Sequence, residues 1–249
     1  MEAYSGFAKV YDFLMRDVDY DSWVDYIEKI FGREGSRPKT ILELACGTGN
    51  ITNRLSKRGY DMIGIDISSE MLTFAKDKAH AIGQDVRYIN QDMRDLNYSK
   101  QVDAIVCLCD GFNYILEEDD LASIFDKVYS LLQDEGIFIF DISSYYKLSK
   151  ILGNNVYGEN YEDVSYLWQN YFDDDSDICE LDLTIFTRDG ELFARHQECH
   201  YQRAYRREMV IELLQSVGFE DIDIYNAFTF EDFQYTDERI CFVCKKSNS

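Results

Sequence analysis

Short apolar runs alternate with segments of helical spacing across residues 40–143. The apolar runs read TILELA, DMIGID, VRYIN, VDAIVCLC and GIFIFDIS. Helical patterns lie between them at residues 48–58, 69–79 and 119–132. Strands that alternate with helices are typical of a parallel sheet covered on both faces. We therefore expect an α/β fold in which residues 40–145 form a doubly wound domain.

Two amphipathic helices are predicted before the sheet, within residues 1–39. Tyr4 and Tyr11 share helical spacing in the first, and Trp23 and Ile27 do so in the second. Such helices either pad the core or close over a site as a lid whose aromatic side chains face a ligand. The sequence leaves both interpretations open.

The pattern changes after residue 145, because β-type runs at residues 166–172, 178–187 and 191–201 follow one another without a helix between them. They predict an antiparallel insertion over residues 146–203. Asp189-Gly190 is a two-residue hairpin signal, and a turn centred there places Arg195 opposite Thr184. A helix at residues 206–217, ended by Gly218, and two further strands follow. Residues 204–249 are therefore expected to complete the core sheet.

Charge is segregated within the insertion. Residues 151–187 contain no Lys or Arg, whereas the next twenty residues carry five arginines and two histidines. Either the acidic and basic strands neutralise one another across the hairpin, or some of the cations face a cavity and hold a substrate anion.

Composition narrows the classes of function. The 249 residues, 46% of them hydrophobic, can bury a sizeable core. The sequence contains neither a signal-peptide pattern nor an apolar run long enough to cross a bilayer, so we expect a cytoplasmic protein without a membrane partner. The 47 acidic residues exceed the 25 basic ones and give a net charge of −22. Because such a field repels phosphate backbones, nucleic acid is not an expected partner.

The seven cysteines are better explained as reduced thiols than as a disulfide framework. Cys241 and Cys244 have the spacing of a metal half-site or a redox motif, but no second pair completes it. Both lie in the apolar run ICFVCKK, so we interpret them as strand residues and expect no metal.

A glycine turn joins the first strand to the first core helix in ILELACGTGNITNRL. Gly47 and Gly49 allow a ligand to approach the backbone, and a helix N-terminus offers free amides and a positive dipole end. A dinucleotide fingerprint that begins at Gly47 requires Gly or Ala at position 52, where the chain has Thr52. Asp66 ends the second strand, where an acid binds ribose hydroxyls or caps the next helix.

The motifs LELACGTGN, GIDIS, NQDMRDL and DAIVCLCDGFNYI together resemble the class I S-adenosylmethionine-dependent methyltransferases. The outer segments resemble those of small stand-alone bacterial members, with an N-terminal helical lid and an antiparallel β insertion. The resemblance implies a Rossmann-like seven-stranded sheet and S-adenosylmethionine as cofactor, with S-adenosylhomocysteine as product. Ala45 departs from the family's fullest motif, which has a third glycine there.

The resemblance also implies roles for individual residues. The glycine turn packs against the methionine part of the cofactor, Asp66 binds the ribose, and Asp92 with Met93 meets the adenine. The full set of expected cofactor contacts is Tyr20, Glu43, Ala45, Cys46, Gly47, Gly49, Asp66, Ile67, Met71, Asp92, Met93 and Leu108.

The sequence defines the methyl acceptor less well than the cofactor. Pro38 is the only proline, so the proline-containing motifs of DNA methyltransferases are absent, and a small-molecule or peptide-like acceptor with a nucleophilic N or O is favoured. A general base is optional for methyl transfer; His196, His200 or a tyrosine is available. The acceptor-side candidates are Tyr11, Asp110, Asn113, Arg195 and His196. The competing functions are a non-catalytic S-adenosylmethionine-binding protein and an NAD(P)-dependent oxidoreductase. The oligomeric state is not predicted.

Overall fold

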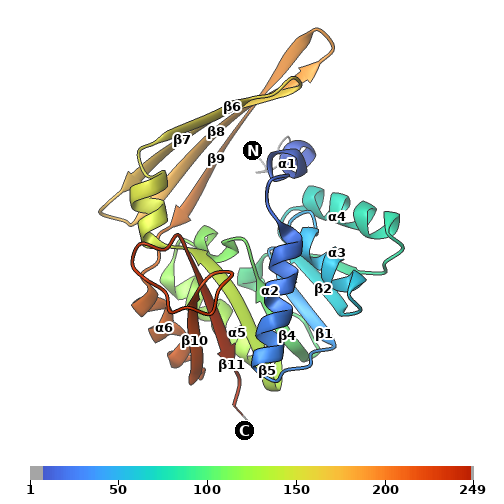
Figure 1. Ribbon diagram of the computed structural model, residues 1–249, viewed down its shortest axis with the longest axis vertical. Coiled ribbons are helices and arrows are strands. Elements are labelled where there is room, and N and C mark those ends of the chain that lie inside the picture. The colour runs from blue at the N-terminus through green and yellow to red at the C-terminus, as the bar shows by residue number, and fades with distance from the viewer. Residues whose placement is uncertain (1–7, 248–249) are drawn as a thin grey trace.

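The computed structural model describes residues 8–247, and Figure 1 labels its helices and strands. The strands of the larger sheet are β1 (Thr40–Leu44), β2 (Asp61–Asp66), β3 (Arg87–Asn90), β4 (Val102–Cys107), β5 (Leu132–Ser143), β10 (Asp221–Asn226) and β11 (Arg239–Lys245). Those of the smaller sheet are β6 (Val156–Asn160), β7 (Val164–Asp173), β8 (Ile178–Asp189) and β9 (Leu192–Arg203). The α-helices are α1 (Ala8–Leu14), α2 (Tyr20–Arg33), α3 (Asn50–Lys57), α4 (Ser69–Ala81), α5 (Glu118–Leu131) and α6 (Arg207–Ser216). Short helical turns are η1 (Met93–Asp95), η2 (Gly111–Tyr114) and η3 (Lys147–Leu152).

The larger sheet has seven strands in the order β10-β11-β5-β4-β1-β2-β3. Strands β1 to β5 are parallel, and β11 runs antiparallel to both of its neighbours, β5 and β10. The predicted doubly wound α/β fold with a seven-stranded sheet and an antiparallel insertion is confirmed. In a sheet of this kind, ligands bind at the carboxyl ends of the parallel strands.

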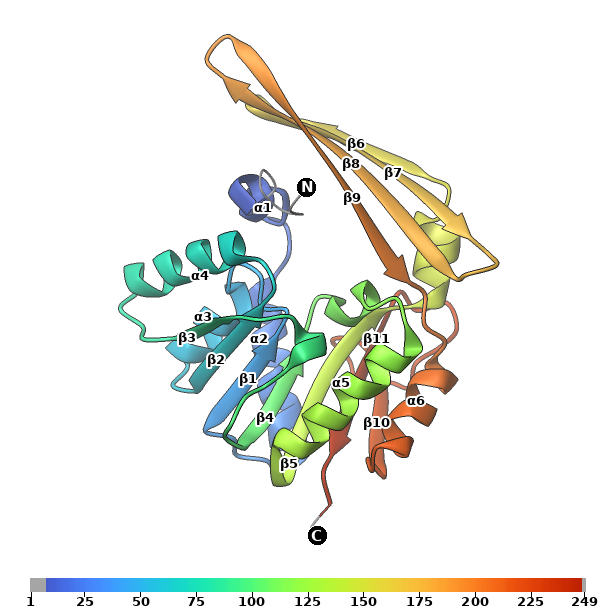
Figure 2. The ribbon, with the colours of Figure 1, turned by 180° about the vertical axis from the view of Figure 1, so that it is seen from behind.

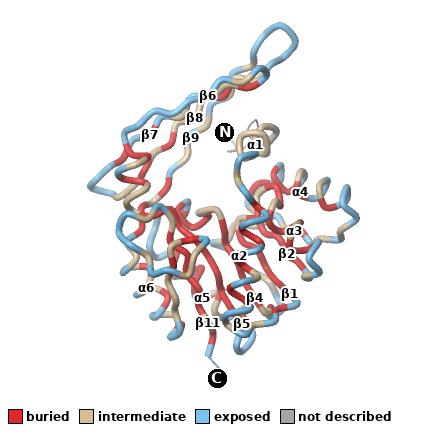
Figure 3. Tube along the Cα trace, viewed as in Figure 1, coloured by how far each residue is buried: buried red, intermediate tan, exposed pale blue. Residues whose placement is uncertain are grey.

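Helices cover both faces of the seven-stranded sheet (Figures 1 and 2). Alternate residues of β1 point to opposite faces: Leu42 and Leu44 pack with α5 and α6, whereas Ile41 packs with α2 and α3. Burial is concentrated in this sheet and in the helices beside it (Figure 3). Cys241 and Cys244 lie buried in β11, as the apolar run predicted.

The four-stranded sheet arches over the carboxyl edge of the core, and α1 lies in the space between them (Figures 1 and 2). Its order is β6-β7-β8-β9, so the three predicted strands are confirmed and β6 was missed. The VYGEN sequence of β6 is exposed at every position and lacks the apolar alternation that marks a half-buried strand.

The predicted hairpin register was wrong. Asp189 pairs with Leu192, so the turn residues are Gly190 and Glu191, and Arg195 lies opposite Phe186 instead of Thr184. Gly190 has a φ of +64°. Glycine at the first central position is typical of a type II′ turn, which moves the turn one residue along the chain.

Helix α1 contacts both the core and the insertion. The Asp12 carboxylate accepts hydrogen bonds from Thr48 Oγ1 (2.7 Å) and Lys78 Nζ (2.8 Å) on the core side. On the other side, the Phe13 ring lies edge-on to Tyr161, which follows β6, with ring centroids 5.4 Å apart. Tyr4 lies outside the described residues. Within residues 8–247, no helix has the length and apolar character required to cross a membrane.

Candidate functional site

A cleft of about 1230 Å³ follows the carboxyl edge of the seven-stranded sheet. Its first half is lined by residues that follow β1, β2 and β3, and its second half by residues that follow β4 and β5 and by inner-face side chains of β7, β8 and β9. Pockets for a single small ligand commonly measure about 300–1,000 Å³. The cleft therefore offers room for two ligands side by side.

The two glycines of the turn have different structural roles. Gly47 has a φ of +54° and lines the cleft, and no atom lies within 4 Å of where a Cβ would stand. Gly49 has a φ of +71°, and a Cβ there would lie 2.3 Å from the Tyr88 hydroxyl oxygen. Only Gly47 leaves backbone bare for a ligand, whereas Gly49 is required by the packing of Tyr88 behind the turn.

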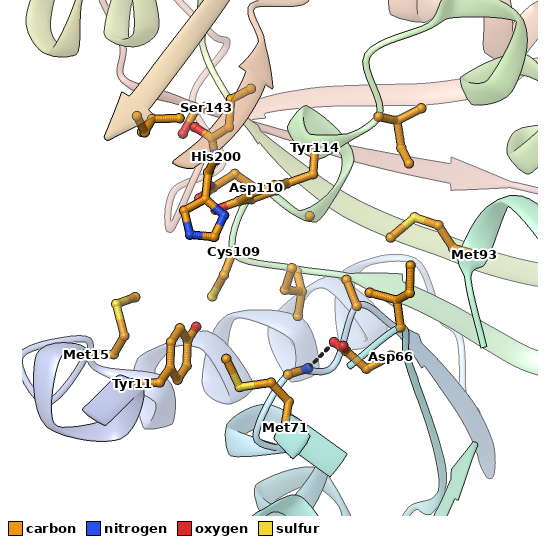
Figure 4. Close-up of a pocket in the computed structure, with 18 of the residues that line it drawn as sticks. Tyr11, Met15, Asp66, Met71, Met93, Cys109, Asp110, Tyr114, Ser143 and His200 are labelled. Atoms are coloured by element: carbon orange, nitrogen blue, oxygen red, sulfur yellow. Dashed lines mark hydrogen bonds between the residues drawn. The ribbon is translucent and has the colours of Figure 1, made fainter. Parts of the chain in front are cut away.

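Asp66 holds the glycine turn from the end of β2. Its Oδ2 accepts the backbone N–H of Gly47 at 2.7 Å, and its Oδ1 accepts that of Ser68 at 2.8 Å. Burial raises the pKa of Asp66 above its usual value. The side chain lies beside the cleft, with Met71 and Met93 nearby (Figure 4). Each carboxylate oxygen retains a further lone pair for a ligand hydroxyl.

Glu43 lies below the turn and does not line the cleft. The residue is 3% exposed, and its Oε2 accepts a hydrogen bond from Thr52 Oγ1 in α3. Burial, together with the nearby Asp66, raises the pKa of Glu43 to about 8. Thr52, which departs from the dinucleotide fingerprint, is thus the partner of this buried acid.

Asp92 lines the cleft after β3, but its carboxylate already has a partner. The Arg94 guanidinium donates to Asp92 Oδ2 at 2.6 and 3.0 Å, and the Arg94 backbone N–H donates to Oδ1 at 2.8 Å. These bonds hold the pKa of Asp92 below its usual value. The Asp92 carboxylate is therefore ionised, and its orientation as a hydrogen-bond acceptor is fixed by Arg94.

The second half of the cleft contains a buried charge cluster. Cys109 and Asp110 both have left-handed backbone, with φ of 58° and 57°. Their N–H groups donate to the fully buried Asp141 carboxylate at 2.7 and 3.1 Å. Arg239, from β11, donates to both Asp141 and Asp110. Strained backbone at non-glycine residues is common at functional sites.

Aromatic groups face this cluster from α1 and from the insertion. Tyr11 of α1 and His200 of β9 both line the cleft, with Cys109 between them and Asp110 beside His200 (Figure 4). His200 Nε2 lies 3.2 Å from Glu198 Oε2, and the His200 ring lies edge-on to that of Tyr114. Burial raises the pKa of Tyr11 well above its usual value, so this phenol is a hydrogen-bond donor and a poor base at neutral pH.

The structure brings only part of the predicted set to the cleft. The predicted residues that line it are Tyr11, Ala45, Gly47, Asp66, Ile67, Met71, Asp92, Met93, Leu108 and Asp110. Tyr20, Glu43, Cys46 and Gly49 lie behind the lining. Sequence reasoning missed Asp141, Lys147, Gln202 and Arg239; a signal existed only for Asp141, an acid inside the apolar run GIFIFDIS.

Three acceptor-side candidates do not line the cleft. Asn113 is fully buried, and its amide donates to the carbonyl oxygens of Ser143 and Arg203. Arg195 is exposed on the outer face of β9. His196 is on the inner face of that strand, beside Thr187 and farther along the arch than His200.

The sheet order, the antiparallel β11, the open glycine turn and the acid at the end of β2 define a class I S-adenosylmethionine-dependent methyltransferase. The residues of the first half of the cleft fit this cofactor: Gly47 leaves open space beside the backbone, and Asp66 has lone pairs for hydroxyl groups.

Comparisons with known proteins agree with this class. Residues 41–136 match the family described as a methyltransferase domain. The putative methyltransferase YqeM of Bacillus subtilis (strain 168) is 36% identical over 99% of this chain and 98% of its own length. A crystal structure of an S-adenosylmethionine-dependent methyltransferase from Clostridium acetobutylicum has a TM-score of 0.90 and 37% identity, and covers 98% of this chain and 99% of that chain. A glycine/sarcosine N-methyltransferase of Aphanothece halophytica is 28% identical over 84% of this chain and 76% of its own length.

This chain belongs to the S-adenosylmethionine-dependent methyltransferase family. It is a methyltransferase enzyme, and S-adenosylmethionine is its cofactor.

Proposed function

We propose that this enzyme methylates a nitrogen atom of a small amine by in-line transfer, with the cofactor in the first half of the cleft and the amine in the second. The observation that carries the proposal is the two-part cleft of about 1230 Å³, in which aromatic and acidic side chains line the second half. Acids and aromatic faces both favour an ammonium group as it approaches. The glycine/sarcosine N-methyltransferase among the similar proteins supports an amine acceptor.

The family resemblance, together with the contacts described above, supports roles for the chain's own residues. Asp66 would hold the ribose hydroxyls of the cofactor, Asp92 would accept from its adenine amino group, and Ala45 and Gly47 would lie against its methionine part. When bound, S-adenosylmethionine supplies a methyl group on a sulfonium. The enzyme's remaining task is to hold the acceptor nitrogen in line and to exclude water. We assign the positioning of the acceptor nitrogen to the charge cluster at Asp110. We assign the exclusion of water to the roof formed by α1 and the insertion.

An amine must lose its proton before it attacks. His200 lines the second half of the cleft beside Glu198 and can take that proton. Tyr11 is unsuited to this task because of its raised pKa, and we infer that it contributes a hydrogen bond or an aromatic face.

The test is a methyl-transfer screen with labelled S-adenosylmethionine and three matched panels: small amines, hydroxyl compounds and short peptides. We expect labelled product with the amines. Product with hydroxyl compounds alone would assign the reaction to oxygen, and product with peptides alone would assign a peptide-like acceptor. Tight cofactor binding without label transfer in any panel would favour a non-catalytic binding protein.

The cytoplasmic location expected from the sequence stays a prediction.

Replacement of Asp66 by alanine should weaken the affinity for both S-adenosylmethionine and S-adenosylhomocysteine at least tenfold, or about 1.4 kcal/mol. The change removes the proposed ribose contact as well as the acceptor of the Gly47 N–H bond. Calorimetric titration with the two compounds measures the effect.

The control for Asp66→Ala is Asp61→Ala at the exposed start of the same strand, which should bind both compounds like the wild type. Equal affinities in the wild type and Asp66→Ala would remove Asp66 from the cofactor site.

A further inference from the structure

Among residues 8–247, the charge cluster in the second half of the cleft leaves one cation without a hydrogen-bonded or ion-paired partner. Asp110 Oδ1 accepts from Arg239 at 2.7 Å, and Asp110 Oδ2 accepts from Gln202 Nε2 at 2.9 Å. Asp141 accepts from Arg239 and from two backbone N–H groups. All four carboxylate oxygens of the cluster are therefore already engaged by groups other than Lys147.

Lys147 begins η3, four residues after the end of β5 at Ser143, and lines the same cleft. Its ammonium group makes no hydrogen bond and no ion pair with another residue in the part of the chain that the structure describes, 8–247. The side chain is partly buried. Burial, and then the neighbouring Arg239, lower the pKa of Lys147, and the weaker attraction of the Asp110, Glu238 and Asp141 carboxylates does not reverse this shift. A partly buried cation of this kind is stabilised when an anion binds beside it.

The other cations of the cleft are neutralised. Arg94 is bound to Asp92, with N···O distances down to 2.6 Å, and Arg239 is bound to Asp110 and Asp141. Lys147 differs from both, because a ligand anion can reach it without displacing a carboxylate of the protein. Trp168 and Leu181, from the insertion, line the same cleft as Lys147.

We propose that Lys147 binds an anionic group of the methyl acceptor, so that the substrate is a small amine that also carries a carboxylate or a phosphate. The anion lies at Lys147, under the insertion, and the amine points toward the first half of the cleft. The inference rests on the proposed function, because it concerns the acceptor of the same reaction. An anion site at Lys147 gives the enzyme a means of rejecting simple amines, because a methyl acceptor without an anionic group leaves the partly buried Lys147 ammonium unpaired.

The first experiment measures anion binding without catalysis. Acetate and inorganic phosphate are titrated at constant ionic strength into the S-adenosylhomocysteine complex of the full chain, and the melting temperature is followed. We expect a saturable rise for the wild type and for Lys147→Arg, and at least a tenfold weaker response for Lys147→Met. Lys150→Met is the matched control, because Lys150 is exposed on the same helical turn. Equal responses in Lys147→Met and the wild type would overturn the proposal.

The second experiment uses acceptors that differ only at one end: propylamine, β-alanine and phosphoethanolamine. The inference predicts a preference for one of the anionic amines over propylamine that Lys147→Met loses and Lys147→Arg keeps. The carboxylate and phosphate arms identify which anion the site takes. Methylation of all three at similar rates, unchanged in Lys147→Met, would overturn the anion site but leave the amine function intact. Anion binding that depends on Lys147, without methyl transfer to any amine, would overturn the amine function alone.

Discussion

The free energy of unfolding of the wild type should decrease as the pH rises from about 5 to about 8. In Glu43→Gln this decrease should be smaller by about 3–4 kcal/mol. Burial raises the pKa of Glu43 from 4.5 to about 8 in the folded chain. A raised acid pKa means that the folded state binds the proton more tightly than the unfolded state does. The contribution of Glu43 is therefore favourable below pH 4.5 and is lost as the pH rises through about 8.

Denaturant titrations of the wild type and Glu43→Gln at several pH values measure this effect, because the difference between the two proteins cancels the other titrating groups. Glu70→Gln, exposed in the first turn of α4, corrects for the loss of a surface carboxyl. Glutamine retains an oxygen that can accept from Thr52, so the variant is expected to fold. Parallel stability curves for the wild type and Glu43→Gln would show that Glu43 titrates alike in the folded and unfolded chains.

Gly49→Ala should destabilise the protein by roughly 2–5 kcal/mol, the sum of a left-handed backbone cost and an overpacking cost. The new methyl group would lie 2.3 Å from the Tyr88 hydroxyl oxygen and 3.0 Å from the Ala75 Cβ. Gly47→Ala should cost only about 1–2 kcal/mol, because open space surrounds the added methyl group. It should instead weaken cofactor binding, because that methyl group enters the cleft.

Chemical denaturation and calorimetry of both variants separate these effects. Adding Tyr88→Phe to Gly49→Ala removes the closest clashing atom and should recover part of the lost stability, so the two changes should not be additive. Equal loss of stability in Gly47→Ala and Gly49→Ala would contradict the different roles assigned to the two glycines.

The parallel core could be predicted from the sequence because its signals are local. Each buried strand is a continuous apolar run, and the acids and glycines that end β1, β2 and β3 meet at one edge of a parallel sheet. Asp66 and Gly47 line the cleft for that reason. The packing of Tyr88 that distinguishes Gly49 from Gly47, and the position of the hairpin turn at Gly190 and Glu191, depend on neighbours in space and were not visible in the sequence.

The second half of the site depends on long-range pairing. Arg239 reaches Asp141 from 98 residues away, because β11 returns antiparallel beside β5. His200 lines the cleft and Arg195 does not, since side chains of β9 alternate between the faces of the arch. A charge count identified the basic character of that strand but not the face on which each side chain lies.

The direction of β11 bears on how the enzyme can be attached to other molecules. Lys245, at the end of this strand, pairs with Ile137 near the start of β5, whereas the cleft is at the opposite edge of the sheet. A tether or fusion partner joined after this strand would extend away from the roof (Figure 1). Immobilisation on a sensor surface through the C-terminal side should therefore leave diffusion of both substrates unobstructed, whereas a bulky group joined ahead of α1 would crowd the roof.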